Sequence, residues 1–105
     1  GLALKSIDKA VELEPDNEEF LFTRAELLKR IGILQGQKNA IAAAVQTYNK
    51  ILEVNPNNAD AWNALGVCMK EQGKEEISRK YYERAQDLVR WGKARRKKRD
   101  LDTIV

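Results

Sequence analysis

Residues 9–17 read KAVELEPDN, and residues 50–58 read KILEVNPNN. Lysine, glutamate, proline and asparagine recur at the same places in both stretches, with apolar residues between them. The two stretches lie 41 residues apart. Recurrence at a fixed spacing of this size is the signature of a repeat architecture, which has to be identified before any single motif is interpreted.

The spacing of matching residues changes along the chain. Ala25 matches Gly66 at a spacing of 41 residues, whereas Tyr48 matches Tyr82 at a spacing of 34. A 34-residue unit that carries a seven-residue insertion accounts for both spacings. The insertion is expected around Ile33–Asn39, where it lengthens the first helix of its unit.

Each unit is predicted to be a pair of helices. Pro15 and Pro56 each end a helix, since proline lacks an N–H group and restricts the residue before it. The pairs Asp16-Asn17 and Asn57-Asn58 follow as good caps for the next helix. Gly36 is expected to end the lengthened helix. Apolar residues recur at helical spacing in both units, which predicts an all-α fold.

These motifs resemble the tetratricopeptide repeat (TPR). Trp62-x-x-Leu65-Gly66 matches the family's first helix, and the second-helix pattern is matched by Ser78, Tyr82 and Ala85. The earlier unit matches through Leu21, Ala25, Leu28, Ala44, Tyr48, Ile51 and Pro56. The resemblance implies antiparallel helix pairs stacked as a short right-handed superhelix of about five helices. Small residues at positions 25 and 66 are expected where two helices cross closely.

The predicted organisation is a TPR array over residues 1–90 followed by a basic extension over residues 91–105. Within the array, residues 1–15 are the second helix of a partial repeat. Residues 16–56 form the repeat with the insertion, and residues 57–90 form the last repeat. Arg90 stands where the family closes a repeat with proline, so the last helix is expected to run on.

Composition argues against catalysis. The chain of 105 residues has no histidine and one cysteine, Cys68. We therefore expect no metal site, no cofactor and no enzyme activity, since a catalytic constellation needs a base, a nucleophile, a metal or a phosphate cradle. A buried structural thiol is expected at Cys68. The lone cysteine fits a reducing compartment, and we predict a cytoplasmic protein without a signal peptide or membrane span.

The resemblance implies a protein–protein interaction scaffold, because first helices in this family line a concave groove that holds an extended peptide or a partner helix. Carried over by position, the groove residues are Glu19, Phe22, Glu26, Lys29, Arg30, Asp60, Asn63, Val67, Lys70 and Glu71. Asn63 would bond a peptide backbone, Arg30 would hold a carboxylate, and Phe22 would anchor an apolar side chain. The alternative is that these residues form an ordinary solvated helix face.

The charge is divided unevenly along the chain. The formal net charge is +3, and six cations stand close together at Lys93, Arg95, Arg96, Lys97, Lys98 and Arg99. Three interpretations remain open: a polar end of the array, a contact for nucleic acid or an acidic partner, and a nuclear-localisation-like cluster. Exposed apolar ends of so short an array could also support a homodimer.

Overall fold

The computed structural model describes the backbone of residues 2–104 and the side chains of residues 2–91. This part of the chain folds into five helices and no strands. They are α1 (Leu2–Leu13), α2 (Glu18–Gln35), α3 (Lys38–Val54), α4 (Ala59–Glu71) and α5 (Glu75–Ile104). The predicted all-α architecture is confirmed.

The first helices of the two complete hairpins begin in the same way. The side chain of Asn17 accepts a hydrogen bond from the Phe20 amide at 3.1 Å, and Asn58 accepts one from the Ala61 amide at 3.0 Å. Each bond satisfies one of the amides that a helix start leaves without an intrahelical partner. The two caps stand 41 residues apart in the chain, which is the spacing of the sequence repeat.

Glycines end the first helix of each hairpin. Gly36 follows α2 with φ 64°, and Gly73 precedes α5 with φ 78°. Only glycine adopts this left-handed region without a steric penalty. The expected end of the long helix at Gly36 is therefore seen. The insertion was expected to lengthen only the first helix of its unit, but it lengthens α3 as well as α2.

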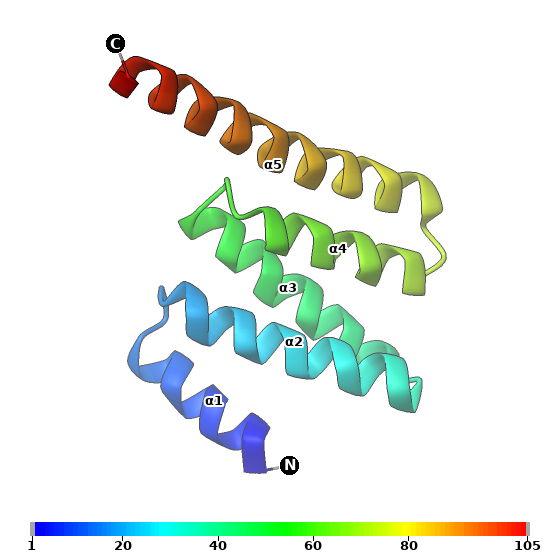
Figure 1. Ribbon diagram of the computed structural model, residues 1–105. Coiled ribbons are helices and arrows are strands. Elements are labelled where there is room, and N and C mark those ends of the chain that lie inside the picture. The colour runs from blue at the N-terminus through cyan, green and yellow to red at the C-terminus, as the bar shows by residue number, and fades with distance from the viewer. Residues whose placement is uncertain (1, 105) are drawn as a thin grey trace.

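Neighbouring helices pack in chain order into a stack (Figure 1). α2 packs on α3 and α4 packs on α5, which gives two hairpins; α1 lies against α2, and α3 joins the hairpins through α4. One core runs through both hairpins, made of Leu21, Ala25, Leu28, Ile41, Ala44, Tyr48, Ile51, Ala61, Ala64, Leu65 and Cys68. The stack holds α2 and α4 in contact with each other, and these two helices carry the predicted groove.

Candidate groove on α2 and α4

The ten predicted groove residues divide evenly between α2 and α4. Six are exposed: Glu19, Arg30, Asp60, Asn63, Lys70 and Glu71. Four are half-buried: Phe22, Glu26, Lys29 and Val67. Exposed charges thus border a strip of half-buried side chains. The groove itself stays a prediction.

Three of the half-buried residues surround the fully buried Tyr48 of α3. The Tyr48 hydroxyl donates a hydrogen bond to the Glu26 carboxylate, and the Phe22 ring meets the Tyr48 ring edge-on at a centroid distance of 6.0 Å. Lys29 Nζ lies 6.0 Å from the centre of the same ring and donates to Glu26 at 2.9 Å. Phe22, Glu26 and Lys29 are therefore held in place by Tyr48, and we call these four residues the Tyr48 cluster.

Contacts within the Tyr48 cluster shift the pKa values of Glu26 and Tyr48. Partial burial tends to raise the pKa of Glu26, but hydrogen bonds from Tyr48 and Lys29 and the charges of Lys29 and Arg30 outweigh burial, so the pKa is lowered overall. Burial and the neighbouring carboxylate raise the pKa of Tyr48 above its ordinary value. At neutral pH the phenol stays a donor and the carboxylate stays an acceptor.

Cys68 lies fully buried on α4, as expected of a structural thiol. Burial is the largest cause that raises its pKa, to about 11. Lys29 of α2 lowers this pKa, whereas Glu26 of α2 and Glu71 of α4 raise it. Charged groups from both α2 and α4 thus influence one thiol. A thiol with a raised pKa is a poor nucleophile at neutral pH.

The exposed residues of the predicted groove offer both charged and hydrogen-bonding side chains. Arg30 and Lys70 supply cations, Glu71 and Asp60 supply carboxylates, and the Asn63 amide can both donate and accept. Within residues 2–91, no group of histidine, cysteine or acidic side chains is arranged to hold a metal ion. None of the described helices is long and apolar enough to cross a bilayer.

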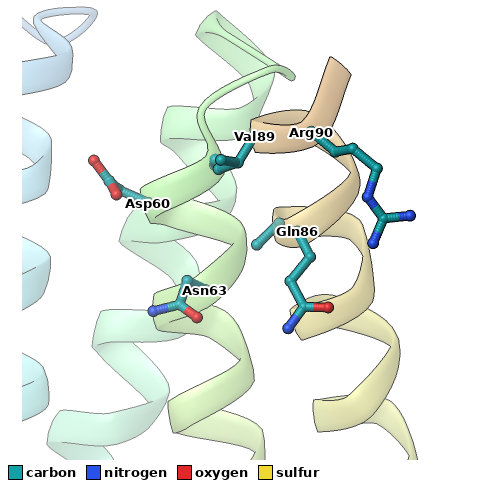
Figure 2. A pocket seen from close by; sticks show the side chains of 7 residues that line it. Asp60, Asn63, Gln86, Val89 and Arg90 are labelled. Atoms are coloured by element: carbon teal, nitrogen blue, oxygen red, sulfur yellow. The ribbon is translucent and has the colours of Figure 1, made fainter. Parts of the chain in front are cut away.

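Side-chain hydrogen bonds that join different helices were not predicted from the sequence. Arg24 of α2 donates to Asp8 of α1 at 2.7 Å and to the buried Thr47 of α3 at 2.5 Å. Such contacts depend on how three helices meet, and the spacing of residues along one helix contains no signal for them. A pocket between α4 and α5, lined by Ala59, Asp60, Asn63, Ala85, Gln86, Val89 and Arg90, was missed as well (Figure 2). Comparison of Ala85 with Ile51 in the repeat register could have found it.

The basic extension continues α5 in the backbone, which is helical without a break past Arg90 to Ile104 (Figure 1). The six cations between Lys93 and Arg99 have side chains outside the described part of the structure. The predictions made for these residues stay predictions.

Most of the chain is similar to parts of longer known proteins. The chain is 34% identical over 91 residues to human protein O-mannosyl-transferase TMTC1, and the match covers 83% of the chain and 10% of the human protein. It is 27% identical over 93 residues to the photosystem I assembly protein Ycf3 of Synechococcus sp. (strain CC9605), and covers 51% of that protein. Against the Arabidopsis thaliana protein NPGR1 the identity is 28% over 86 residues, or 12% of that protein. The chain thus spans a tenth to a half of the lengths of these relatives.

Two windows of the chain, residues 25–58 and 47–80, match the family described as tetratricopeptide repeat. Together they cover residues 25–80, which include most of α2, all of α3 and α4, and the start of α5. The capped helix starts, the left-handed glycines and the stacked hairpins agree with this match, and the chain belongs to the tetratricopeptide-repeat family.

Proposed function

We propose that this stretch of the chain acts without catalysis, as a protein-binding module that holds an extended peptide or a partner helix across α2 and α4. TPR domains generally mediate protein–protein interaction, and the Ycf3 relative is by its name an assembly protein. The observation that carries the proposal is the contact between α2 and α4, first helices of different hairpins, which together carry all ten predicted groove residues.

The Tyr48 cluster and the exposed groove residues are expected to contribute to binding in different ways. Tyr48 holds the side chains of Phe22, Glu26 and Lys29 in place, so they are already ordered before a partner binds. Less conformational entropy is then lost on binding. The exposed Arg30, Asn63, Lys70 and Glu71 then supply direction and specificity.

The test is capture from a nuclease-treated cell lysate with the intact chain and two matched charge reversals. Arg30→Glu changes an exposed cation of the predicted groove, and Lys80→Glu changes an exposed cation of α5 outside it. We expect proteins held by the intact chain and by Lys80→Glu to be lost with Arg30→Glu. Equal capture by both variants would contradict the groove.

A photo-crosslinking residue at position 63 locates the contact directly. We expect crosslinks to the captured protein from position 63 and none from position 80. The same assay with a chain ended after Gly92 addresses the alternative function, in which the basic extension binds nucleic acid or an acidic partner. Capture that depends on the extension, or on nucleic acid, would move the function to Lys93–Arg99.

A further inference from the structure

The charges of the predicted groove are sorted along α2 and α4. Glu19 stands in the first turn of α2, and Asp60 stands in the first turn of α4. Lys29 and Lys70 stand ten residues farther along the same two helices. At the 41-residue spacing of the repeat, each acid therefore corresponds to an acid and each lysine to a lysine. About 15 Å of helix separates the two kinds of charge.

The starts of α2 and α4 lie side by side. The Glu18 carboxylate of α2 accepts hydrogen bonds from the side chains of Asn55, at 3.0 Å, and Asn58, at 3.2 Å. Asn58 is the N-cap of α4, so this bond joins the beginnings of the two helices. From there both helices run in the same direction (Figure 1). Glu19 and Asp60 therefore belong to one end of the groove, and we call these two residues the acidic end.

Cations prevail at the other end of the groove. The basic residues there are Lys29, Arg30 and Lys70, and the acidic ones are Glu26 and Glu71. Lys29 is already paired with Glu26 at 2.9 Å, within the Tyr48 cluster. Arg30, Lys70 and Glu71 are exposed, and together they leave a net positive charge. We call Arg30 and Lys70 the basic end.

Both ends stay exposed although helices pack on either side of them. α4 packs against α2, α3 and α5, and Asp60 and Lys70 are exposed nevertheless. α2 packs against α1, α3 and α4, and Glu19 and Arg30 are exposed as well. Asp60 projects from α4 away from α5 (Figure 2). Among the residues whose side chains are described, no ion pair involves any of these four. Their charges are therefore available to a partner.

Half-buried apolar side chains lie between the two ends. Phe22 of α2 and Val67 of α4 are both half-buried, and the Phe22 ring is held against the ring of Tyr48. Along their helices, both residues stand between the acidic end and the basic end. A partner that follows the two helices must therefore offer apolar side chains in its middle and opposite charges at its two ends.

The charge pattern that fits this surface also favours a helix in one direction. Carboxylates stabilise the N-terminal turn of a helix, and cations stabilise its C-terminal turn. A helix with this pattern matches the groove when its basic last turn lies at the acidic end and its acidic first turn lies at the basic end. It then runs antiparallel to α2 and α4. A parallel helix would have to carry its charges against its own dipole.

We propose that the groove binds an amphipathic α-helix of a partner protein, antiparallel to α2 and α4. The acidic first turn of this helix contacts Arg30 and Lys70, and its basic last turn contacts Glu19 and Asp60. Apolar side chains between the turns pack on the half-buried strip. The groove is that of the proposed function, on which this proposal rests, and the partner is now defined by its chemistry and its direction.

A designed helix is the probe. It has about 14 residues, which is enough to reach both ends, with glutamates in its first turn, lysines in its last turn and leucines on one face between them. It is stapled, because short isolated helices are marginal in water, and carries a nitroxide label at its C-terminus. It is titrated into the ¹⁵N-labelled full chain at low salt, where charges are least screened. We expect the label to broaden the amides of Glu19 and Asp60 more strongly than those of Arg30 and Lys70.

Matched charge reversals test the acidic end. Glu19→Lys/Asp60→Lys reverses it, whereas Glu83→Lys/Asp87→Lys reverses two exposed acids of α5 outside the groove. Both double variants change the net charge of the chain equally. We expect the first to weaken binding of the probe about tenfold and the second to leave it unchanged.

Exchange of both ends is a test of direction. Glu19→Lys, Asp60→Lys, Arg30→Glu and Lys70→Glu together keep the net charge of the chain. The same probe should bind this variant in the opposite direction, so that its label broadens the amides of positions 30 and 70 most. Loss of the fold cannot imitate this result, because an unfolded chain would not bind in reverse.

Three results would overturn the proposal. Equal broadening at both ends would show that the charges do not orient a helix. Unchanged amides throughout α2 and α4 would show that the helix does not bind there. Equal affinity for the same peptide with a central proline, which breaks a helix, would assign the groove to an extended segment. Failure of the proposed function is recognised separately, by capture that Arg30→Glu does not change and by the lack of crosslinks from position 63.

Discussion

At the scale of single residues, the close packing of α4 against α5 depends on the absence of a side chain at Gly66. A Cβ atom built on Gly66 of α4 would lie 2.8 Å from Cε1 of the Tyr82 ring on α5, and two further ring atoms lie within 3.0 Å. The small residue expected where helices cross is thus required at this position. The sequence predicted that crossing from the alignment of Ala25 with Gly66, but it could not predict which aromatic ring fills the space.

We expect Gly66→Ala to lower the free energy of unfolding by about 1–3 kcal/mol, because the tyrosine ring has to move within a packed core. Urea denaturation followed by circular dichroism measures the loss. Shortening the opposing side chain should relieve it, so the double variant Gly66→Ala/Tyr82→Leu should lose less than the sum of the two single variants. Additive losses would mean that the ring is not the obstacle.

The protonation of Glu26 affects the stability of the fold, and the direction of this effect follows from the lowered pKa of its carboxyl group. A carboxyl whose folded pKa lies below its unfolded value stabilises the fold above the unfolded pKa. That contribution is lost as the pH falls toward the folded pKa. Lys29, Arg30 and the Tyr48 hydroxyl are the groups that favour the charged form.

We therefore expect Glu26→Gln to be less stable than the wild-type chain at pH 7, and the difference to shrink as the pH falls below the ordinary carboxyl value of 4.5. Urea denaturation of both chains across this pH range measures the difference. A constant difference at all pH values would assign the loss to packing.

At the scale of elements, α1 is the least anchored helix of the stack. None of its residues is buried, and α2 is the helix it packs on. The Arg24–Asp8 ion pair ties it to the second helix at 2.7 Å. A helix with few buried apolar contacts opens locally at low cost. Its existence was predictable from apolar spacing and Pro15, whereas its dependence on Arg24 was not, since that contact joins residues 16 apart in sequence.

We expect Asp8→Ala to speed amide hydrogen exchange throughout α1 while exchange in α4 stays unchanged. The loss should be modest, about 0.2–1 kcal/mol in the local opening free energy, since both partners are partly exposed. Asp16→Ala removes the longer and more exposed Lys50–Asp16 pair, at 3.5 Å, and is the matched control. Equal acceleration of α1 and α4 would mean that the stack opens as one unit.

The insertion illustrates what the sequence leaves open about an element. The length of the insertion followed from the difference between the two repeat spacings, 41 and 34 residues, and Gly36 marked the end of α2. The sequence did not predict how the added residues divide, because a helix can be extended on either side of a turn. In the structure α2 extends to Gln35 and α3 already begins at Lys38, so both helices of the hairpin grow longer.

At the scale of the whole molecule, the helices are stacked in the order in which they occur in the sequence. The molecule measures 54 × 35 × 20 Å along its principal axes. Such a stack was predictable because each helix packs mainly on its neighbours in sequence. The pocket at its α4–α5 end was missed, although comparison of the two units residue by residue could have found it. It arises where the chain departs from its own repeat, with Ala85 at the position of Ile51.

At the same scale, charge is divided unevenly between the stack and the basic extension. A chain ended after Gly92 loses six cations and two aspartates, which changes the formal net charge from +3 to −1. The buried residues of the described core lie before this point, the last of them being Ala85, so we expect the urea midpoint to be unchanged. If the extension binds duplex DNA through its cations, the logarithm of the affinity should fall with the logarithm of salt concentration at a slope approaching about −5. The shortened chain should then lose that binding. Equal binding by both chains would place any nucleic-acid contact on the stack, where exposed carboxylates alternate with cations and the salt dependence should be much weaker.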